Sequence, residues 1–128
     1  MPLSWKESYL TGQTDIDLQH QMLFDVTARL VAARSPEMQA LCAKSLYDDT
    51  RDHFEHEERL MNDTGYPELS THRKLHQSLL RRLDEITHEI ADHSLNLNKL
   101  ESFITDWLIT HIITADAAMA NHIELALH

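Results

Sequence analysis

The sequence contains very little cysteine, glycine or proline, and each shortage excludes a class of structure. Its 128 residues include one cysteine, two glycines and three prolines. The single thiol, Cys42, rules out a disulfide within the chain and is compatible with a reducing compartment. We expect it to be a small buried residue on a helix. Because β-hairpins and other turn-rich folds need glycine and proline at their turns, the shortage of both disfavours such folds.

Long apolar segments and an excess of positive charge are also missing. No apolar run reaches the roughly 20 residues that cross a bilayer, and residues 1–6 lack the charged and apolar regions of a signal peptide. The sequence therefore predicts a cytoplasmic protein with no membrane partner. Lys and Arg number 11 against 21 Asp and Glu, which gives a net charge of −10 and argues against a nucleic-acid partner.

Apolar residues recur at helical spacing along most of the chain, after an irregular arm at residues 1–13. The length suits a single domain over 1–128. Ser35 before Pro36 is a helix start signal, and Gly65 with Pro67 marks a stop. The pattern predicts four helices, over about 15–34, 36–62, 70–91 and from the residue after the polar break 92–94 to beyond 114.

The third of these segments shows the inward seam of a bundle helix most clearly. Its apolar and histidine positions alternate steps of three and four: Leu69, His72, His76, Leu79, Leu83, Ile86 and Ile90. Four such amphipathic helices with short links predict an all-α fold. The expected architecture is an up-down-up-down antiparallel four-helix bundle with the irregular arm at its N-terminus.

The sequence is rich in histidine, with 10 in all, and several lie on the faces expected to point inward. Seven ionisable residues share this inward position: His20, His53, Glu57, His72, His76, His111 and Asp116. The pairs His53/Glu57 and His72/His76 have i,i+4 spacing, which places both side chains on one helix face. Uncompensated, seven buried ionisable groups would cost more than the ~5–15 kcal/mol that stabilises a domain.

A metal site compensates such groups best. Any one of these histidines alone would be read as a hydrogen-bonded core residue, but two i,i+4 pairs with three more donors favour metal binding. Imidazole and carboxylate ligands without a thiolate favour a pair of iron or manganese ions over a structural zinc site. Five further histidines do not fit the inward pattern and are expected on solvated faces: His56, His88, His93, His122 and His128.

Four sequence strings resemble the motifs of the hemerythrin family, in its bacteriohemerythrin branch. Residues 53–61, HFEHEERLM, resemble the family's H-F-x-x-E-E-x-x-M, and residues 71–76, THRKLH, resemble its H-x-x-x-H. Residues 16–20, IDLQH, resemble I-D-x-Q-H, and residues 107–116 resemble W-x-x-x-H-x-x-x-x-D. The resemblance spans nearly the whole chain and implies the bundle fold predicted above.

The resemblance also implies a diiron centre with an oxo or hydroxo bridge. The implied ligands of one iron are His72, His76 and His111. The implied ligands of the other are His20 and His53, with Glu57 and Asp116 bridging both ions. Because the second iron has fewer ligands, it keeps an open position, where dioxygen binds reversibly. The expected function is oxygen transport, storage or delivery, without enzymatic turnover.

The resemblance leaves the surroundings of the ligands less defined. We expect a water-excluding oxygen pocket lined by five apolar residues: Leu23, Phe54, Trp107, Leu108 and Ile112. Ordinary packing in the hydrophobic core explains each of these residues equally well. Glu58 and Tyr66 either orient ligands or lie on the solvated surface. Asp116 follows His111 by five residues, about 140° away on an ideal helix, so we expect a local distortion of that helix or a long reach by Asp116.

Three other functions remain open at the level of sequence. Bacterial members of the family are often oxygen- or redox-sensing input domains, which would add a C-terminal signalling domain or another protein as partner. A diiron oxidase or peroxidase would use more carboxylates and fewer histidines than this chain offers. A metal-free helical interaction domain would leave the inward histidines without explanation.

Overall fold

A computed structural model describes residues 5–127, except for the side chains of residues 107, 113 and 127. The chain forms α1 (Thr14–Ala32), α2 (Pro36–Asp63), α3 (Leu69–Ala91) and α4 (Leu97–His111), and a π-helical segment, Ile112–Asp116, joins α4 to α5 (Ala117–Leu127). Across 5–127 there is no strand, which confirms the predicted all-helical class.

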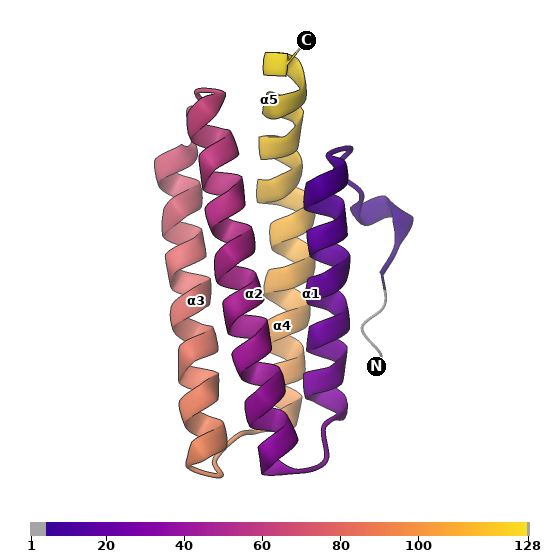
Figure 1. Cartoon of the computed structure of the whole chain (residues 1–128), viewed down its shortest axis with the longest axis vertical. Coiled ribbons are helices and arrows are strands. Elements are labelled where there is room, and N and C mark those ends of the chain that lie inside the picture. The colour runs from indigo at the N-terminus through magenta and orange to yellow at the C-terminus, as the bar shows by residue number, and fades with distance from the viewer. Residues whose placement is uncertain (1–4, 128) are drawn as a thin grey trace.

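The helices form the predicted antiparallel bundle (Figure 1). Consecutive helices run in opposite directions, and α4, the π-helical segment and α5 continue as one long rod. The N-terminal arm lies along the outer side of α1. Between residues 5 and 127, no helix is both long and apolar enough to cross a membrane.

The helix boundaries follow from local hydrogen bonds. The Ser35 side chain accepts a hydrogen bond from the backbone N–H of Met38, with Pro36 at the first helical position of α2. Asn96 caps α4 in the same way, through the N–H of Lys99. Gly65, at φ 68°, allows the turn after α2 because glycine has no Cβ to clash in the left-handed region.

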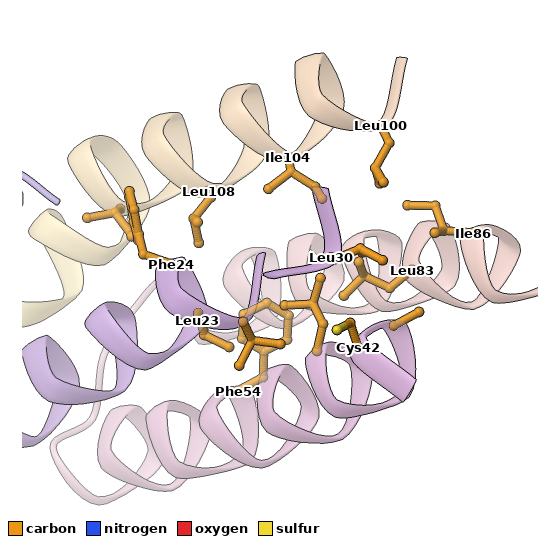
Figure 2. Close-up of a cluster of buried hydrophobic side chains, with 14 of the residues drawn as sticks. Leu23, Phe24, Leu30, Cys42, Phe54, Leu83, Ile86, Leu100, Ile104 and Leu108 are labelled. Atoms are coloured by element: carbon orange, nitrogen blue, oxygen red, sulfur yellow. The ribbon is translucent and has the colours of Figure 1, made fainter. Parts of the chain in front are cut away.

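The core consists of two apolar clusters with the ionisable residues between them. The larger cluster runs from Leu23, Phe54 and Leu108 toward the α1–α2 and α3–α4 turns, and includes Cys42 as predicted (Figure 2). The smaller cluster comprises Ile16, Met61, Met119 and Ile123. On α1, His20 lies between Ile16 of the smaller cluster and Leu23 of the larger one, and on α2, Glu57 lies between Phe54 and Met61. A layer of ionisable side chains therefore lies between the two apolar clusters.

The N-terminal arm is fastened to α1 by Asp17 and by aromatic packing. The buried carboxylate of Asp17 accepts hydrogen bonds from the backbone N–H and the hydroxyl of Thr11, both at 2.8 Å, and from the N–H of Gly12 at 3.3 Å. The rings of Trp5 and Tyr9 pack with Phe24 of α1. Because Asp17 lies three residues before His20, the same contacts fix the start of α1.

Replacing Asp17 with alanine should lower the free energy of unfolding by about 2–3 kcal/mol. Hydrogen bonds to a charged acceptor contribute more than neutral ones, and the substitution removes the acceptor of three hydrogen bonds from Thr11 and Gly12. Urea denaturation followed by circular dichroism measures the effect. Asp15→Ala, an exposed aspartate in the same helical turn, is the control and should change stability far less. Equal losses in the two variants would contradict the structural role of Asp17.

Candidate metal centre

The seven inward ionisable residues predicted from the sequence converge in the middle of the bundle, and none is more than 7% exposed. Helices α1 to α4 and the π-helical segment each contribute to the cluster. The residues are His20 from α1, His53 and Glu57 from α2, His72 and His76 from α3, His111 from α4, and Asp116 from the π-helical segment. The bundle thus brings together groups separated by up to 96 residues in the chain (116 − 20).

The cluster divides into two sets of donor atoms that share both carboxylates. Within each set, the possible ligand atoms lie within 4.8 Å of one another. One set adds a three-histidine group, His72, His76 and His111, to the carboxylates. The other set adds a two-histidine group, His20 and His53. The shared members are Glu57 and Asp116, so the site offers donor sets for two neighbouring ions.

Glu57 divides its two oxygens between the two groups. Oε1 lies 3.1 Å from Nε2 of His76 and 3.9 Å from Nε2 of His72, both in the three-histidine group. Oε2 lies 3.1 Å from Nε2 of His53 and 3.7 Å from Nε2 of His20, in the two-histidine group. A carboxylate with one oxygen toward each set of donors has the geometry of a bridging ligand.

Asp116 divides its oxygens in the same way. Oδ1 lies 2.9 Å from Nε2 of His111 and 3.0 Å from Nε2 of His72, whereas Oδ2 lies 2.9 Å from Nε2 of His20. The π-helical segment makes this possible because its wider turn brings residue i+5 back toward the face of His111. The local distortion expected from the His111-to-Asp116 spacing is therefore confirmed.

The carboxylates keep their charge despite complete burial. Burial and the charge of Asp116 would each raise the pKa of Glu57, but His53 and His20 outweigh them and hold it well below its usual range. Burial likewise opposes ionisation of Asp116, yet His111, His20 and His72 hold its pKa low. Burial lowers the pKa of His20, but the two carboxylates raise it to about 9. A metal ion binding here displaces protons from the histidines.

The donor atoms fit metal ions better than they fit one another. Buried polar atoms in proteins are almost always hydrogen-bonded. In the described part of the chain, however, several buried atoms at the centre of the cluster have no hydrogen-bond partner: Nε2 of His20, His53, His76 and His111, both oxygens of Glu57, and Oδ2 of Asp116. Two cations with nitrogen and oxygen preferences would satisfy all of them.

Comparison with known protein families agrees with this geometry. The family model described as "Hemerythrin HHE cation binding domain" matches residues 11–123, which include all seven residues of the cluster. The chain belongs to the hemerythrin family. Its buried histidine and carboxylate cluster is the diiron-type site of that family.

Relatives and solved structures extend along nearly the whole chain. A bacteriohemerythrin of Pseudomonas aeruginosa is 30% identical, over 95% of this chain and 82% of that protein. A bacteriohemerythrin of Stenotrophomonas maltophilia is 26% identical, over 98% and 84%. The myohemerythrin of Riftia pachyptila is 28% identical, over 87% and 85%. A crystal structure of a hemerythrin with a leucine-to-tyrosine substitution has the same fold, with a TM-score of 0.86 at 23% identity over 96% of this chain and 98% of that one.

Four of the five expected pocket residues are buried in the larger apolar cluster. Leu23, Phe54, Leu108 and Ile112 are at most 2% exposed and belong to the larger apolar cluster. Phe54 stacks on the ring of His76, with ring centroids 3.7 Å apart and planes 3° from parallel. The side chain of Trp107 lies outside the described residues. Phe54 also packs with the rings of His53 and His111.

Two surface grooves approach the site from outside. One, of about 400 Å³, lies between α3 and α4 and reaches His111, with Leu75, Leu79 and Phe103 along its walls. The other, of about 220 Å³, reaches His53 beside Gln19. One histidine from each group thus borders a groove.

The remaining histidines divide into two kinds. His88 and His93 are exposed, as predicted, and His128 lies outside the described residues. His56 and His122 are half-buried, so the expected solvated position is wrong for them. The ring of His122 donates from Nε2 to the carbonyl of Thr64 at 2.9 Å, because α5 extends far enough to reach that carbonyl at the end of α2.

Sequence reasoning missed one contact to a ligand and left another undecided. Oε1 of Gln19 lies 2.5 Å from Nδ1 of His53, a contact that was not anticipated. Oε2 of Glu58 lies 2.9 Å from Nδ1 of His76, which favours the ligand-orienting alternative for Glu58. Tyr66 packs half-buried against the rings of His72 and His122. The signal for Gln19 was present in the string IDLQH, where it immediately precedes His20.

Proposed function

We propose that this chain binds dioxygen reversibly at a non-haem diiron centre bridged by carboxylates, as an oxygen carrier, store or delivery protein. The observation that carries the proposal is the division of Glu57 and Asp116, each with one oxygen toward either histidine group. We assign one iron to the three-histidine group and the other to the two-histidine group, with both carboxylates bridging.

The inequality of the two groups supports ligand binding over a purely structural role. A metal with fewer protein ligands keeps a coordination position open, as reactive metal sites do. When bound, the iron pair supplies the electrons for reversible binding of dioxygen. Five histidines with two carboxylates form a nitrogen-rich set, whereas diiron oxidases of this architecture use more carboxylates. The similarity to bacteriohemerythrins and myohemerythrins supports dioxygen as the ligand.

The chain's own contribution to reversibility is the exclusion of water. The residues we assign to a water-excluding apolar layer are all buried in the larger cluster, and Phe54 stacks on the ring of His76: Leu23, Phe54, Leu108 and Ile112. Water and external acids that cross this layer would promote irreversible oxidation of the iron pair. Leu23 lies three residues after His20 and therefore on the same face of α1, beside the two-histidine group.

Replacing Leu23 with alanine should speed autoxidation several-fold without removing iron. The smaller side chain opens the apolar layer beside the two-histidine group. Stopped-flow or slow-scan spectroscopy of the oxygenated protein measures the decay, and metal analysis checks the iron content. Leu30→Ala is the matched control, because Leu30 is an equally buried leucine of α1 two turns farther from His20. If both variants decay at the rate of the unmodified protein, Leu23 is simply a core residue.

Reductant consumption under air separates oxygen binding from oxidase chemistry. The reduced diiron protein is mixed with an excess of dioxygen and an excess of a mild electron donor, and an oxygen electrode follows uptake. Binding predicts uptake of one dioxygen per chain, after which the trace stays flat and the donor is conserved. Continuous uptake with matching consumption of the donor would overturn the proposal in favour of an oxidase.

A further inference from the structure

Two of the ligand histidines have their second ring nitrogen in contact with an acceptor. Nδ1 of His76 lies 2.9 Å from Oε2 of Glu58, and Nδ1 of His53 lies 2.5 Å from Oε1 of Gln19. Carboxylate and amide oxygens only accept hydrogen bonds, so both rings carry a proton on Nδ1. Nε2 of each ring, 3.1 Å from an oxygen of Glu57, is therefore the nitrogen that would bind a metal ion, on opposite sides of the site.

The two acceptors differ in charge. Glu58 is a carboxylate, 23% exposed, and its other oxygen accepts a hydrogen bond from Nε of Arg73 at 2.9 Å. Arg73 thereby fixes the carboxylate in place. Gln19 offers a neutral amide oxygen from α1. A carboxylate that accepts from a ligand imidazole makes the ring more basic and a stronger metal ligand, whereas an amide mainly fixes its orientation.

We propose that Glu58 and Gln19 are positioning residues that set unequal metal affinities in the two halves of the site. The charge of Glu58, acting through His76, strengthens the three-histidine half beyond what its extra ligand supplies. The neutrality of Gln19, acting through His53, leaves the two-histidine half weaker. This inference rests on the ligand assignment of the proposed function. It predicts stepwise loading, with the three-histidine half filled first.

Anaerobic titration of the metal-free protein with Co²⁺ measures the two affinities. Co²⁺ accepts the same nitrogen and oxygen ligands and reports its coordination through visible absorption bands. Competition with a chelator of known affinity gives a dissociation constant for each step. The His111→Ala variant identifies the step that belongs to the three-histidine half, because that step should weaken most in this variant.

Substitutions at Glu58 separate charge from orientation. Glu58→Gln keeps an acceptor but removes the charge, and should weaken the tight step about 10-fold. Glu58→Met removes both and should weaken it about 100-fold, within the range for groups that support a ligand. The weak step should be unchanged in both. Glu55→Gln is the control: it removes the same charge from an exposed position on α2 and should leave both steps unchanged.

The outcomes of this series decide the inference. Unchanged affinity in both Glu58 variants would overturn it. Equal weakening in Glu58→Gln and Glu55→Gln would also overturn it, because the effect would then be one of net charge alone. Thermal unfolding of the metal-free variants checks that the substitutions leave the fold intact.

The reverse substitution, Gln19→Glu, supplies an independent test. A carboxylate at this position should tighten the weak step about 10-fold and narrow the gap between the two steps. An unchanged or weaker second step would overturn the role assigned to Gln19. The Co²⁺ titration does not involve dioxygen. If the metal affinities change as stated but the protein does not bind dioxygen, only the proposed function is refuted. If the metal affinities are unchanged in the Glu58 and Gln19 variants and these variants still bind dioxygen, only this inference is refuted.

Discussion

Replacing His111 with alanine should reduce the iron content of the purified protein from two ions per chain to one. His111 lies in the three-histidine group, and its Nε2 faces Oδ1 of Asp116 at 2.9 Å. Without it, that half keeps only two histidines and loses the partner that helps to place Asp116. A metal site that has lost one of its ligands does not retain its iron while unbound metal is removed by gel filtration. Iron analysis after anaerobic reconstitution and gel filtration measures the effect.

A matched control distinguishes loss of a ligand from loss of a histidine. His88→Ala removes an exposed histidine near the end of α3 and should leave two irons per chain. Circular dichroism of the metal-free proteins should show the same helix content in both variants. Retention of both irons by the His111→Ala protein would refute the ligand assignment.

Removing the metal should lower the midpoint of thermal unfolding by about 15–30 °C. Each ion bound far above its dissociation constant adds about 3–4 kcal/mol to folding stability, and a domain of this size shifts by several degrees per kcal/mol. The physical reason lies in the polar layer, where Glu57 and Asp116 are fully buried among histidines. Differential scanning calorimetry of iron-loaded and metal-free protein, both under nitrogen, measures the shift.

The Glu57→Gln variant provides the reference for this experiment. It removes the charge of one bridging carboxylate and should lose most of the metal-dependent rise in stability. The metal-free form of the variant should unfold close to the metal-free unmodified protein. Coincident unfolding curves for the loaded and metal-free unmodified protein would show that the buried cluster is stabilised without metal.

The fold was largely predictable because its signals are local. The seam of α3, from Leu69 to Ile90, repeats at helical spacing without interruption, and the Ser35-Pro36 start of α2 is a capping signal that depends on neighbouring residues only. Even the π-helical segment was anticipated as a distortion, because the five-residue step from His111 to Asp116 conflicts with an ideal helix.

The contacts that the sequence did not predict join residues far apart in the chain. The partner of Gln19 is His53, 34 positions away, and the contact depends on the rotation of α1 against α2. His122 reaches Thr64 across 58 positions because α5 continues past the π-helical segment. Hydrophobic periodicity shows which face of a helix points inward. It does not show how α1 is rotated against α2 or which residues α5 contacts.

The division of each carboxylate between the two histidine groups was also beyond the sequence. Spacing places Glu57 one turn after His53, but it does not say that Oε1 faces His76 and Oε2 faces His53. From the sequence, the bridging role of Glu57 and Asp116 is implied by family resemblance alone. The observed division of their oxygens is the basis on which we propose that role.

The most direct test of the central proposal is a cycle of oxygenation followed by ultraviolet–visible spectroscopy. The protein is loaded with two irons, reduced under nitrogen, exposed to air and then returned to vacuum. Reversible binding predicts charge-transfer bands that appear in air, vanish under vacuum and return over several cycles with little loss. Bands that form once and persist under vacuum, or no bands at all in protein that holds two irons, would contradict the proposed function.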